Sequence, residues 1–152
     1  MQAQDVMNRA VITIRPHMPV GAAAALLVAR GVTSAPVVTA EGMLRGIVSE
    51  ADLLRGKTAA SHGPTEHTAT AGEVMTPQPV TVRPTDELAE VAAVLLDRGV
   101  CAVPVVDGER LVGILSRRDV LSLIAQEAPP PSRSDRPVTK TAWPQSKRGL
   151  RR

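Results

Sequence analysis

Hydrophobic and polar positions follow two periods along this chain, and the order of the periods recurs. Residues 11–14 and 80–82 are short runs rich in Val, Ile and Thr, and each run is closed by Arg-Pro, so both predict strands that end at proline. Apolar residues then recur at helical spacing, which predicts two helices with one buried face each. These positions are Val20, Ala23, Ala24 and Leu27 in the first helix and Leu88, Val91, Ala92 and Leu95 in the second.

The boundaries of these two helices also carry signals. Gly31 and Gly99 follow the last apolar positions and predict the helix ends. Thr85 is a suitable N-cap for the second helix, because Asp86 and Glu87 would then lie in its first turn, where the helix dipole favours acidic groups.

A hairpin and a further helix are expected after each of these helices. Pro-Val-Val segments predict buried strands entered through proline, and a short turn leads each of them into a second apolar run. The predicted strands are 35–38 and 44–48 in the first half and 103–106 and 111–115 in the second. The last helices open at Ser49 and Ser116 and carry leucines that we expect to face the core. Each half is thus predicted to be a β-α-β-β-α unit.

The two halves are copies of each other. The motifs Val-Met, Thr-x-Arg-Pro, Arg-Gly-Val, Pro-Val-Val and Gly-Ile-x-Ser-x-x-Asp-x-Leu all occur twice, 68 residues apart up to Val106 and 67 apart after it. One residue lost between Val106 and Gly113 explains the change and shortens only the second hairpin. We therefore divide the chain into repeat 1 (1–60), repeat 2 (72–128) and a tail (129–152), with a linker at 57–71.

Length and composition restrict how these repeats can fold. The chain has 152 residues, 43% of them hydrophobic, with no Phe, no Tyr and one Trp. A unit of about 60 residues buries a marginal fraction of its apolar surface when alone, so the two repeats are expected to fold against each other. A core of Val, Leu, Ile and Ala suits thin layers, and the fold class is predicted to be α/β (α+β).

Several function classes are disfavoured by what the sequence lacks. The longest apolar run, residues 20–29, is shorter than the roughly 18 residues needed to span a bilayer, and the first residues do not resemble a secretory signal, so we expect a cytoplasmic protein without a membrane span. The single cysteine, Cys101, aligns with Thr33 and is interpreted as a packing residue. His62 and His67 lie five residues apart, which does not suit metal binding on one helix face.

The high isoelectric point comes from the tail alone. Residues 132–152 hold seven of the 18 basic residues and one of the 15 acidic residues, which leaves eleven basic and fourteen acidic residues elsewhere. The repeats are therefore mildly acidic, and nucleic-acid binding is not expected of them. The tail is predicted to be disordered, because it is too poor in apolar residues to fold, and it alone could contact nucleic acid or anionic lipid.

The motif with candidate chemistry is Gly-Ile-x-Ser-x-x-Asp, which ends in Asp52 in repeat 1 and in Asp119 in repeat 2. Ser followed three residues later by Asp is also a capping box, in which each side chain bonds to the other residue's backbone amide. That structural role alone would account for either copy. However, a helix start that emerges from a strand offers free amides to a phosphate, and the Asp could accept hydrogen bonds from two ribose hydroxyls. On the residues alone, a helix cap and a nucleotide site remain equally open.

The duplicated unit resembles a CBS domain pair, or Bateman module, over roughly residues 1–128. The resemblance is carried by the Val-Met opening, the Thr-x-Arg-Pro and Gly-Val-x-x-x-Pro-Val-Val segments and the Gly-Ile-x-Ser-x-x-Asp-x-Leu close in both copies. It implies that two units pack by pseudo-twofold symmetry, leave two clefts for AMP, ADP, ATP or S-adenosylmethionine, and dimerise into a disc-like module. Leu54 and Leu121 are then candidate positions between protomers.

The resemblance also implies roles for individual residues. Asp52 and Asp119 would hold ribose hydroxyls, and Ser49 and Ser116 would contact phosphate. The residues expected to line the adenine pockets are Thr13, Ala35, Pro36 and Val37 in repeat 1 and Thr81, Val103, Pro104 and Val105 in repeat 2.

The two copies differ in charge beside the proposed phosphates. Glu50 and Ala51 in repeat 1 become Arg117 and Arg118 in repeat 2. Because arginine suits phosphate and glutamate repels it, we hypothesise that the cleft at Asp119 prefers the more highly phosphorylated ligand. The alternative is that both arginines are solvated helix residues.

No pattern of residues supports catalysis, since there is no Gly-rich phosphate loop with Lys and no His-Glu-x-x-His motif. The first hypothesis is a regulatory sensor, not an enzyme, that requires no cofactor, binds an adenosine-containing ligand and acts on a separate, unknown target protein. The alternative is a ligand-free dimeric scaffold that presents its basic tail to a partner, nucleic acid or an anionic surface.

Overall fold

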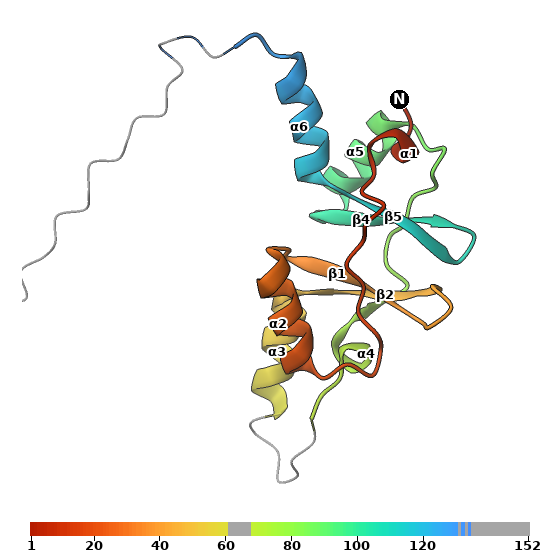
Figure 1. Cartoon of the computed structure of the whole chain (residues 1–152), viewed down its shortest axis with the longest axis vertical. Coiled ribbons are helices and arrows are strands. Elements are labelled where there is room, and N and C mark those ends of the chain that lie inside the picture. Colours follow the sequence, from red (N-terminus) through yellow and green to blue (C-terminus); the bar gives the residue numbers. More distant parts are fainter. Residues whose placement is uncertain (61–67, 131, 133, 135–152) are drawn as a thin grey trace, which may run out of the picture.

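The computed structural model describes residues 1–60, 68–130, 132 and 134 (Figure 1). The larger elements of the first repeat are α2 (Val20–Arg30), β1 (Ser34–Val38), β2 (Leu44–Ser49) and α3 (Glu50–Ala60). Those of the second repeat are α5 (Leu88–Asp97), β4 (Ala102–Asp107), β5 (Arg110–Ser116) and α6 (Arg117–Glu127). Three short elements were not predicted: α1 (Ala3–Val6), α4 (Ala71–Val74) and β3 (Thr76–Pro77). The predicted order of helix, hairpin and helix is confirmed in both repeats.

The helix ends follow the glycine signals but not the threonine signal. Helix α2 ends at Gly31, which adopts the left-handed conformation (φ 63°), and Gly99 has the same φ just beyond α5. The prediction that Thr85 caps α5 is wrong, because this helix begins at Leu88 with Glu87 as its N-cap. The Asp86 carboxylate instead accepts a hydrogen bond from the backbone amide of Arg83, so this acidic side chain stabilises the turn before the helix.

The predicted strands at 11–14 and 80–82 are wrong. In each segment a single residue pairs with the sheet in parallel, Ile14 with Val37 and Val82 with Val105. The Ile14 amide donates to Pro36 and its carbonyl accepts from the Val38 amide, both at 2.9 Å, and the chain then turns away through Arg-Pro. One residue of pairing is too short to count as a strand.

The predicted linker at 57–71 is wrong at its beginning, because α3 continues as a helix to Ala60. His62, His67 and residues 135–152 of the tail lie outside the described residues, so the expectations for them remain predictions. The end of the linker segment is ordered against repeat 1, since the Ala69 carbonyl accepts a hydrogen bond from the Val20 amide at 2.9 Å.

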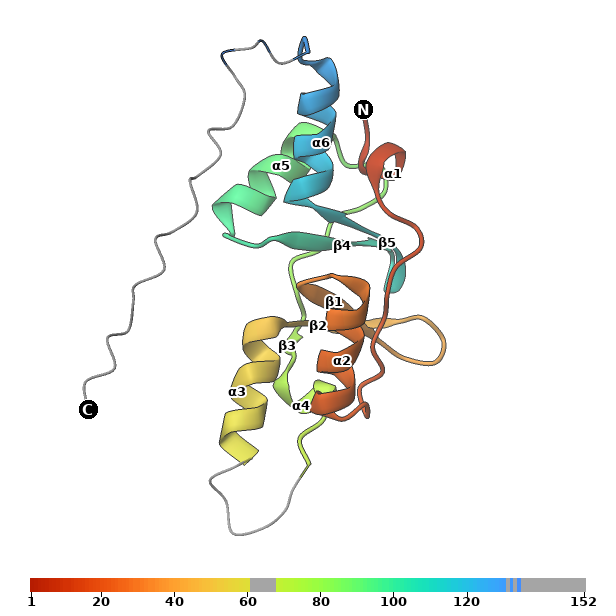
Figure 2. The ribbon, with the colours of Figure 1, turned by 60° about the vertical axis from the view of Figure 1, so that its left-hand side comes forward.

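The two sheets face each other at the centre, and the helices cover their outer sides (Figures 1 and 2). One sheet has the antiparallel order β1-β2-β3, and the other is the antiparallel hairpin β4-β5. Helices α2, α3 and α4 cover the first sheet, while α1, α5 and α6 cover the second (Figure 1).

The two repeats exchange their opening segments. Helix α1 begins repeat 1 but packs on repeat 2, and α4 begins repeat 2 but packs on repeat 1 (Figure 1). We call each place where a segment of one repeat passes onto the other repeat a crossing. Backbone hydrogen bonds hold both crossings in place in the same pattern. The amides of Ala3 and Gln4 donate to the carbonyls of Asp86 and Pro84, and those of Ala71 and Gly72 donate to Met18 and Pro16, all at 2.8–2.9 Å.

The hydrophobic cores confirm this exchange. One buried cluster contains Ile14, Leu27, Val37 and Val48 of repeat 1 together with Ala71 of repeat 2. The other is built on repeat 2 but includes Ala3 and Met7 of repeat 1, which are 0% and 8% exposed. The sequence repeats and the packed units therefore differ at their N-terminal ends, and neither repeat can complete its core without the other.

Each crossing passes directly over a glycine of the other repeat. A Cβ atom built on Gly46 would lie 2.6 Å from both the Met75 sulfur and the Thr76 carbonyl oxygen. A Cβ atom on Gly113 would lie 2.5 Å from the Met7 sulfur. The Val-Met and Gly-Ile motifs are thus two sides of one contact, because only glycine lets the other repeat's methionine segment lie this close.

The pseudo-twofold symmetry can be followed in individual hydrogen bonds. The two hairpin tips meet where Met43 pairs with Arg110, and these two residues are equivalent under the 67-residue offset. The Leu44 amide donates to the Glu109 carbonyl at 2.9 Å, and the Leu111 amide donates to the Gly42 carbonyl at 3.1 Å. The same offset converts one bond into the other, so the pseudo-axis passes between the tips.

The last helix of each repeat is less buried than its leucines suggested. Leu53 is 4% exposed, but Leu54 is 68% exposed, and on α6 Leu121 and Ile124 are 63% and 60% exposed. Helix α6 buries none of its residues fully. The expectation that all these leucines face the core is wrong. Within the described part of the chain, no helix has both the length and the apolar character needed to cross a membrane.

Replacing the crossing glycine tests this packing. Gly46→Ala is expected to lower the free energy of unfolding by about 1–3 kcal/mol, because the added methyl meets a backbone carbonyl that cannot move aside alone. Gly113→Ala should cost less, since its closest neighbours are atoms of the flexible Met7 side chain and the nearest backbone atom, the Asn8 carbonyl oxygen, is 3.2 Å away. Urea unfolding followed by circular dichroism measures both values.

Gly21→Ala is the matched control for these variants. Gly21 lies within α2 with open space around its Cβ position, so alanine should raise stability by roughly 0.5–1 kcal/mol. Equal stability changes for Gly46→Ala and Gly21→Ala would refute the role given to the crossing.

Candidate ligand-binding cleft

The Ser-x-x-Asp motif of repeat 1 forms the predicted helix cap at the start of α3. The Ser49 hydroxyl accepts a hydrogen bond from the Asp52 amide at 3.2 Å. Oxygen Oδ2 of Asp52 accepts from the Ser49 amide and from the Ser49 hydroxyl, both at 2.9 Å. Its other oxygen, Oδ1, accepts from Nη2 of Arg55 at 2.6 Å. The cap therefore occupies one carboxylate oxygen of Asp52 and leaves the other for a different partner.

The motif of repeat 2 has the same cap at the start of α6. Ser116 and Asp119 form a capping box in which Asp119 Oδ2 accepts from the Ser116 amide and hydroxyl, both at 2.7 Å. No arginine contacts the second oxygen of Asp119 in the described part of the chain. The structural role that the sequence left open is thus present in both copies, and only repeat 1 adds an ion pair.

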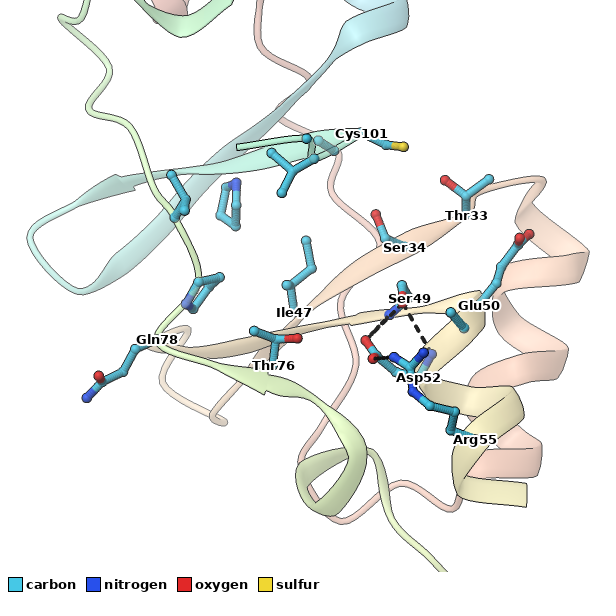
Figure 3. A pocket seen from close by; sticks show the side chains of 17 residues that line it. Thr33, Ser34, Ile47, Ser49, Glu50, Asp52, Arg55, Thr76, Gln78 and Cys101 are labelled. Atoms are coloured by element: carbon cyan, nitrogen blue, oxygen red, sulfur yellow. Dashed lines mark hydrogen bonds and ion pairs between the residues drawn. The ribbon is translucent and has the colours of Figure 1, made fainter. Parts of the chain in front are cut away.

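A cavity of about 580 Å³ lies between the repeats beside Asp52 (Figure 3). Helix α3 and strand β2 form one wall with Ser49, Asp52, Arg55 and Ile47. The opposite wall is formed by the loop before β4 and the start of that strand, residues 99–102, together with Pro104. The volume falls in the range of about 300–1,000 Å³ that small-molecule sites occupy.

The third side of the cavity comes from the segment that crosses between the repeats. Thr76 belongs to β3, and the chain then continues along the cavity through Gln78, Pro79 and Val80. Gln78 has a positive φ of 48°, the only such value among the described residues other than glycine. A left-handed backbone is costly for a residue other than glycine, so the surrounding structure must stabilise it. The pairing of β3, which directly precedes Gln78, holds this turn in place.

The structure brings together some of the predicted site residues and separates others. Ser49, Asp52 and Pro104 line the cavity, whereas Ser116 and Asp119 lie at the pseudo-symmetric position. Thr13 and Thr81 are exposed and do not line the cavity. The other predicted lining residues, Ala35, Pro36, Val37, Val103 and Val105, are buried and do not line it either.

The period of a β-strand explains this division. Successive side chains of a strand point to opposite faces, so Ala102 and Pro104 can line the cavity only if Val103 and Val105 point away from it. Val103 and Val105 belong to the hydrophobic core and are both 0% exposed. This cavity is therefore lined by alternate residues of β4, an alternation that the contiguous segment predicted from the sequence did not take into account.

Other lining residues were missed because their signals are weak or absent in the sequence. Arg55 follows Asp52 by three residues, so helical spacing alone places both on one face of α3. Thr33 and Cys101 are repeat equivalents on the two loops that precede β1 and β4, and both line this one cavity. Thr76 and Gln78 reach it through the exchange of segments, which the repeat pattern did not reveal.

Arg117 and Arg118 have different environments. The Arg117 guanidinium donates from Nε to the Val100 carbonyl at 2.9 Å and from Nη2 to the Leu95 carbonyl at 3.0 Å. A phosphate-binding role would require Arg117 to leave the Leu95 carbonyl of α5 and the Val100 carbonyl of the loop that follows this helix. Arg118 is exposed and makes no side-chain hydrogen bond or ion pair with the described residues. Among the described residues, Arg118 is thus the one of the two arginines whose side chain makes no hydrogen bond or ion pair.

Fold and cleft together define a class of protein in which two repeated α/β units exchange their first segments and enclose a cavity between their sheets. A family model described as "CBS domain" matches residues 3–57 and again 71–126. The chain belongs to the CBS domain family, and the two matches make it a Bateman module.

Known relatives agree in fold over most of the chain. CBSX2, a CBS-pair protein of Arabidopsis thaliana whose structure was solved in complex with AMP, is 32% identical, with a TM-score of 0.73 over 82% of this chain and 96% of that one. The CBS domain pair of protein MJ0100, solved with 5′-methylthioadenosine and S-adenosyl-L-methionine, is 25% identical, with a TM-score of 0.71 over 82% of this chain and 99% of that one.

A third relative is Hypoxic response protein 1 of Mycobacterium tuberculosis. It is 29% identical over 126 residues, which are 83% of this chain and 87% of that protein. Its crystal structure contains two coordinated zinc ions and has a TM-score of 0.69 to this chain over 85% of this chain and 100% of that one. The described residues of the present chain hold no group of three or more His, Cys, Asp and Glu side chains that could bind a metal ion.

Arg117 is expected to stabilise the wall of the cavity. Arg117→Ala should lower the free energy of unfolding by about 0.5–1.5 kcal/mol, because the Leu95 carbonyl of α5 and the Val100 carbonyl of the following loop lose a charged donor. The rate at which Cys101 reacts with a thiol reagent should rise, since Val100 is its neighbour. Arg118→Ala is the control and should change stability by less than about 0.5 kcal/mol. Equal effects of the two substitutions would contradict the placement of Arg117.

Proposed function

We propose that this chain is a regulatory module that binds an adenosine-containing ligand, such as AMP, ADP, ATP or S-adenosylmethionine, in the cavity beside Asp52. The observation that carries the proposal is the position of the Asp52 carboxylate. Its side chain is 11% exposed and lies at the wall of an interrepeat cavity, with one oxygen fixed by the helix cap and the other turned to Arg55. A carboxylate held in this way keeps acceptor capacity on Oδ1 for a ribose hydroxyl.

The rest of the cavity is compatible with the other parts of such a ligand. Ile47, Val80 and Pro104 provide apolar surface for a flat base. The Ser49 hydroxyl and the start of α3 lie beside Asp52, where amide groups and the positive end of the helix dipole favour an anionic group. The relatives CBSX2, with AMP, and MJ0100, with S-adenosyl-L-methionine, support this class of ligand.

The pseudo-symmetric position at Ser116 and Asp119 is proposed as a second, unequal cleft. It shares the cap geometry of the first cleft but has Arg118 where the first has Ala51. We still predict that this cleft prefers more highly phosphorylated ligands. Because the Arg117 side chain bonds to two carbonyls, Arg118 is the arginine that would contact the additional phosphate.

We infer a regulatory and not a catalytic role. The described residues that line the cavity include Cys101 but no His or Lys that could act as its base. CBS-pair proteins are in general regulatory modules, so the target is proposed to be a separate protein in the cytoplasm, and no cofactor is required.

We also propose that two copies associate through the outer helices. Val28 and its repeat equivalent Leu96 are 82% and 69% exposed, and Leu54 and its equivalent Leu121 are 68% and 63% exposed. The helix pairs α2/α3 and α5/α6 thus carry the same kind of apolar surface at equivalent positions. A second copy is the occupant that fits, because a twofold interface must be complementary to itself.

Ligand binding is tested by thermal unfolding of the chain with AMP, ADP, ATP and S-adenosylmethionine. A ligand that binds only the folded state adds about 2.7 kcal/mol at 100 times its dissociation constant, which raises the melting temperature measurably. For each variant, the shift is the difference between its melting temperatures with and without ligand. We expect Asp52→Ala to reduce this shift and Asp119→Ala to reduce the part of it that comes from the second cleft. No shift with any of the four ligands would refute the sensor and favour the scaffold.

Self-association is tested by light scattering after size-exclusion chromatography. We expect the unmodified chain to elute as a dimer and the double variant Leu54→Glu, Leu121→Glu to elute as a monomer, because each substitution buries a charge in an apolar interface. Gln126→Glu adds a charge to α6 at another exposed position and should leave the mass unchanged. A monomeric unmodified chain is the result that contradicts the proposed dimer.

A further inference from the structure

Arg55 is the only basic side chain among the described residues that line the cavity (Figure 3). Its neighbours in the lining include two acidic side chains, Glu50 and Asp52. Without Arg55, an anionic ligand entering this cavity would meet two carboxylates and no cation. The charge of the cleft therefore depends on one side chain.

The position of Arg55 allows its guanidinium to contact Asp52 and a bound ligand at the same time. Its side chain is 72% exposed, while that of Asp52 is 11% exposed, so the ion pair connects a nearly buried carboxylate with the open side of the cavity. Only Nη2 donates to Asp52, and a guanidinium has five N–H donors in a planar fork. The remaining donors are available to a phosphate group.

The Asp52 carboxylate also retains acceptor capacity beside Arg55. Oδ2 accepts two hydrogen bonds from Ser49, and Oδ1 accepts one from Arg55 at 2.6 Å. Because two carboxylate oxygens offer about four acceptor positions, one position on Oδ1 remains for a ribose hydroxyl. Ligand binding thus does not require the ion pair to break.

In repeat 2, no such arginine is paired with the aspartate of the helix cap among the described residues. The equivalent of Arg55 under the 67-residue offset is Ser122, which donates its hydroxyl to the Arg118 carbonyl at 2.8 Å and, among the described residues, makes no hydrogen bond to Asp119. The same cap is therefore built twice, but a cation on its carboxylate is present once. This difference was not visible in the Ser-x-x-Asp motif itself.

We propose that Arg55 determines ligand specificity in the Asp52 cleft by favouring adenosine ligands that carry phosphate over uncharged ones. The inference rests on the proposed adenosine-binding function and adds the residue that distinguishes phosphorylated from uncharged ligands. The guanidinium offsets Asp52 in the empty cleft and donates its free N–H groups to phosphate in the occupied one. An uncharged nucleoside gains only the contacts to Asp52 and the apolar walls.

The test compares AMP with adenosine, which differ only in the phosphate. Cys101 lines the same cavity and is the only cysteine of the chain, so protection of its thiol from a maleimide reports occupancy of this cleft alone. Dissociation constants for both compounds are measured in this way for the full chain and for Arg55→Ser, which copies the residue of repeat 2. Circular dichroism checks that each variant is folded.

We expect Arg55→Ser to weaken AMP binding about tenfold and to change adenosine binding by less than about twofold, as the loss of one exposed charge-assisted contact predicts. Arg55→Lys should recover part of the AMP affinity. Arg45→Ser, which removes an exposed charge of β2 outside the cavity, should leave the ratio of the two affinities unchanged.

Two failures can be told apart. Equal weakening of AMP and adenosine by Arg55→Ser would overturn the inference while leaving the adenosine site in place, because Arg55 would then only support the cleft. If neither compound protects Cys101 in the unmodified chain, the proposed function fails, and this inference fails with it.

Discussion

The close contact between each glycine-led strand and the other repeat's methionine segment is the constraint on which the rest of this structure depends. Met75 lies on Gly46 and Met7 lies on Gly113, so closely that a Cβ atom on either glycine would force neighbouring atoms to shift. These contacts bring α4 and α1 onto the opposite repeats and so complete two cores that are too small to form alone. The duplication is therefore a folding requirement as well as a record of ancestry.

The same exchange creates the cleft. Strand β3 pairs with β2 at Gly46 and Ile47, and the chain then continues along the cavity to Val80. Asp52 is held by its own helix cap on a wall formed by repeat 1, but the other two walls of the cavity, residues 76–80 and 99–104, come from repeat 2. Occupancy of the cavity would accordingly affect contacts between the repeats, which gives a regulatory module a physical means of transmitting binding.

The sequence predicted the main elements because their signals are local. Helical spacing found α2 and α5, proline and glycine found the hairpins, and Ser-x-x-Asp found the caps of α3 and α6. The strands at 11–14 and 80–82 failed because apolar runs do not show how many residues pair. The exchange of α1 and α4 could not be found in this way, since a repeat pattern shows which segments correspond but not which ones pack together.

The sequence directed attention to the candidate cleft where a local motif forms part of its wall, as at Ser49 and Asp52, but not where the wall depends on residues outside the motif. Arg55 illustrates the limit. The comparison of the two repeats directed attention to Arg117 and Arg118, which are adjacent to the motif, while the structure engages Arg117 with the carbonyls of Leu95 and Val100. A cation one helical turn from Asp52 contacts the carboxylate at 2.6 Å, whereas its counterpart Ser122 bonds its own helix. The two caps are alike in their hydrogen bonds, so the difference in charge between the two positions comes from residues such as these, which the cap does not constrain.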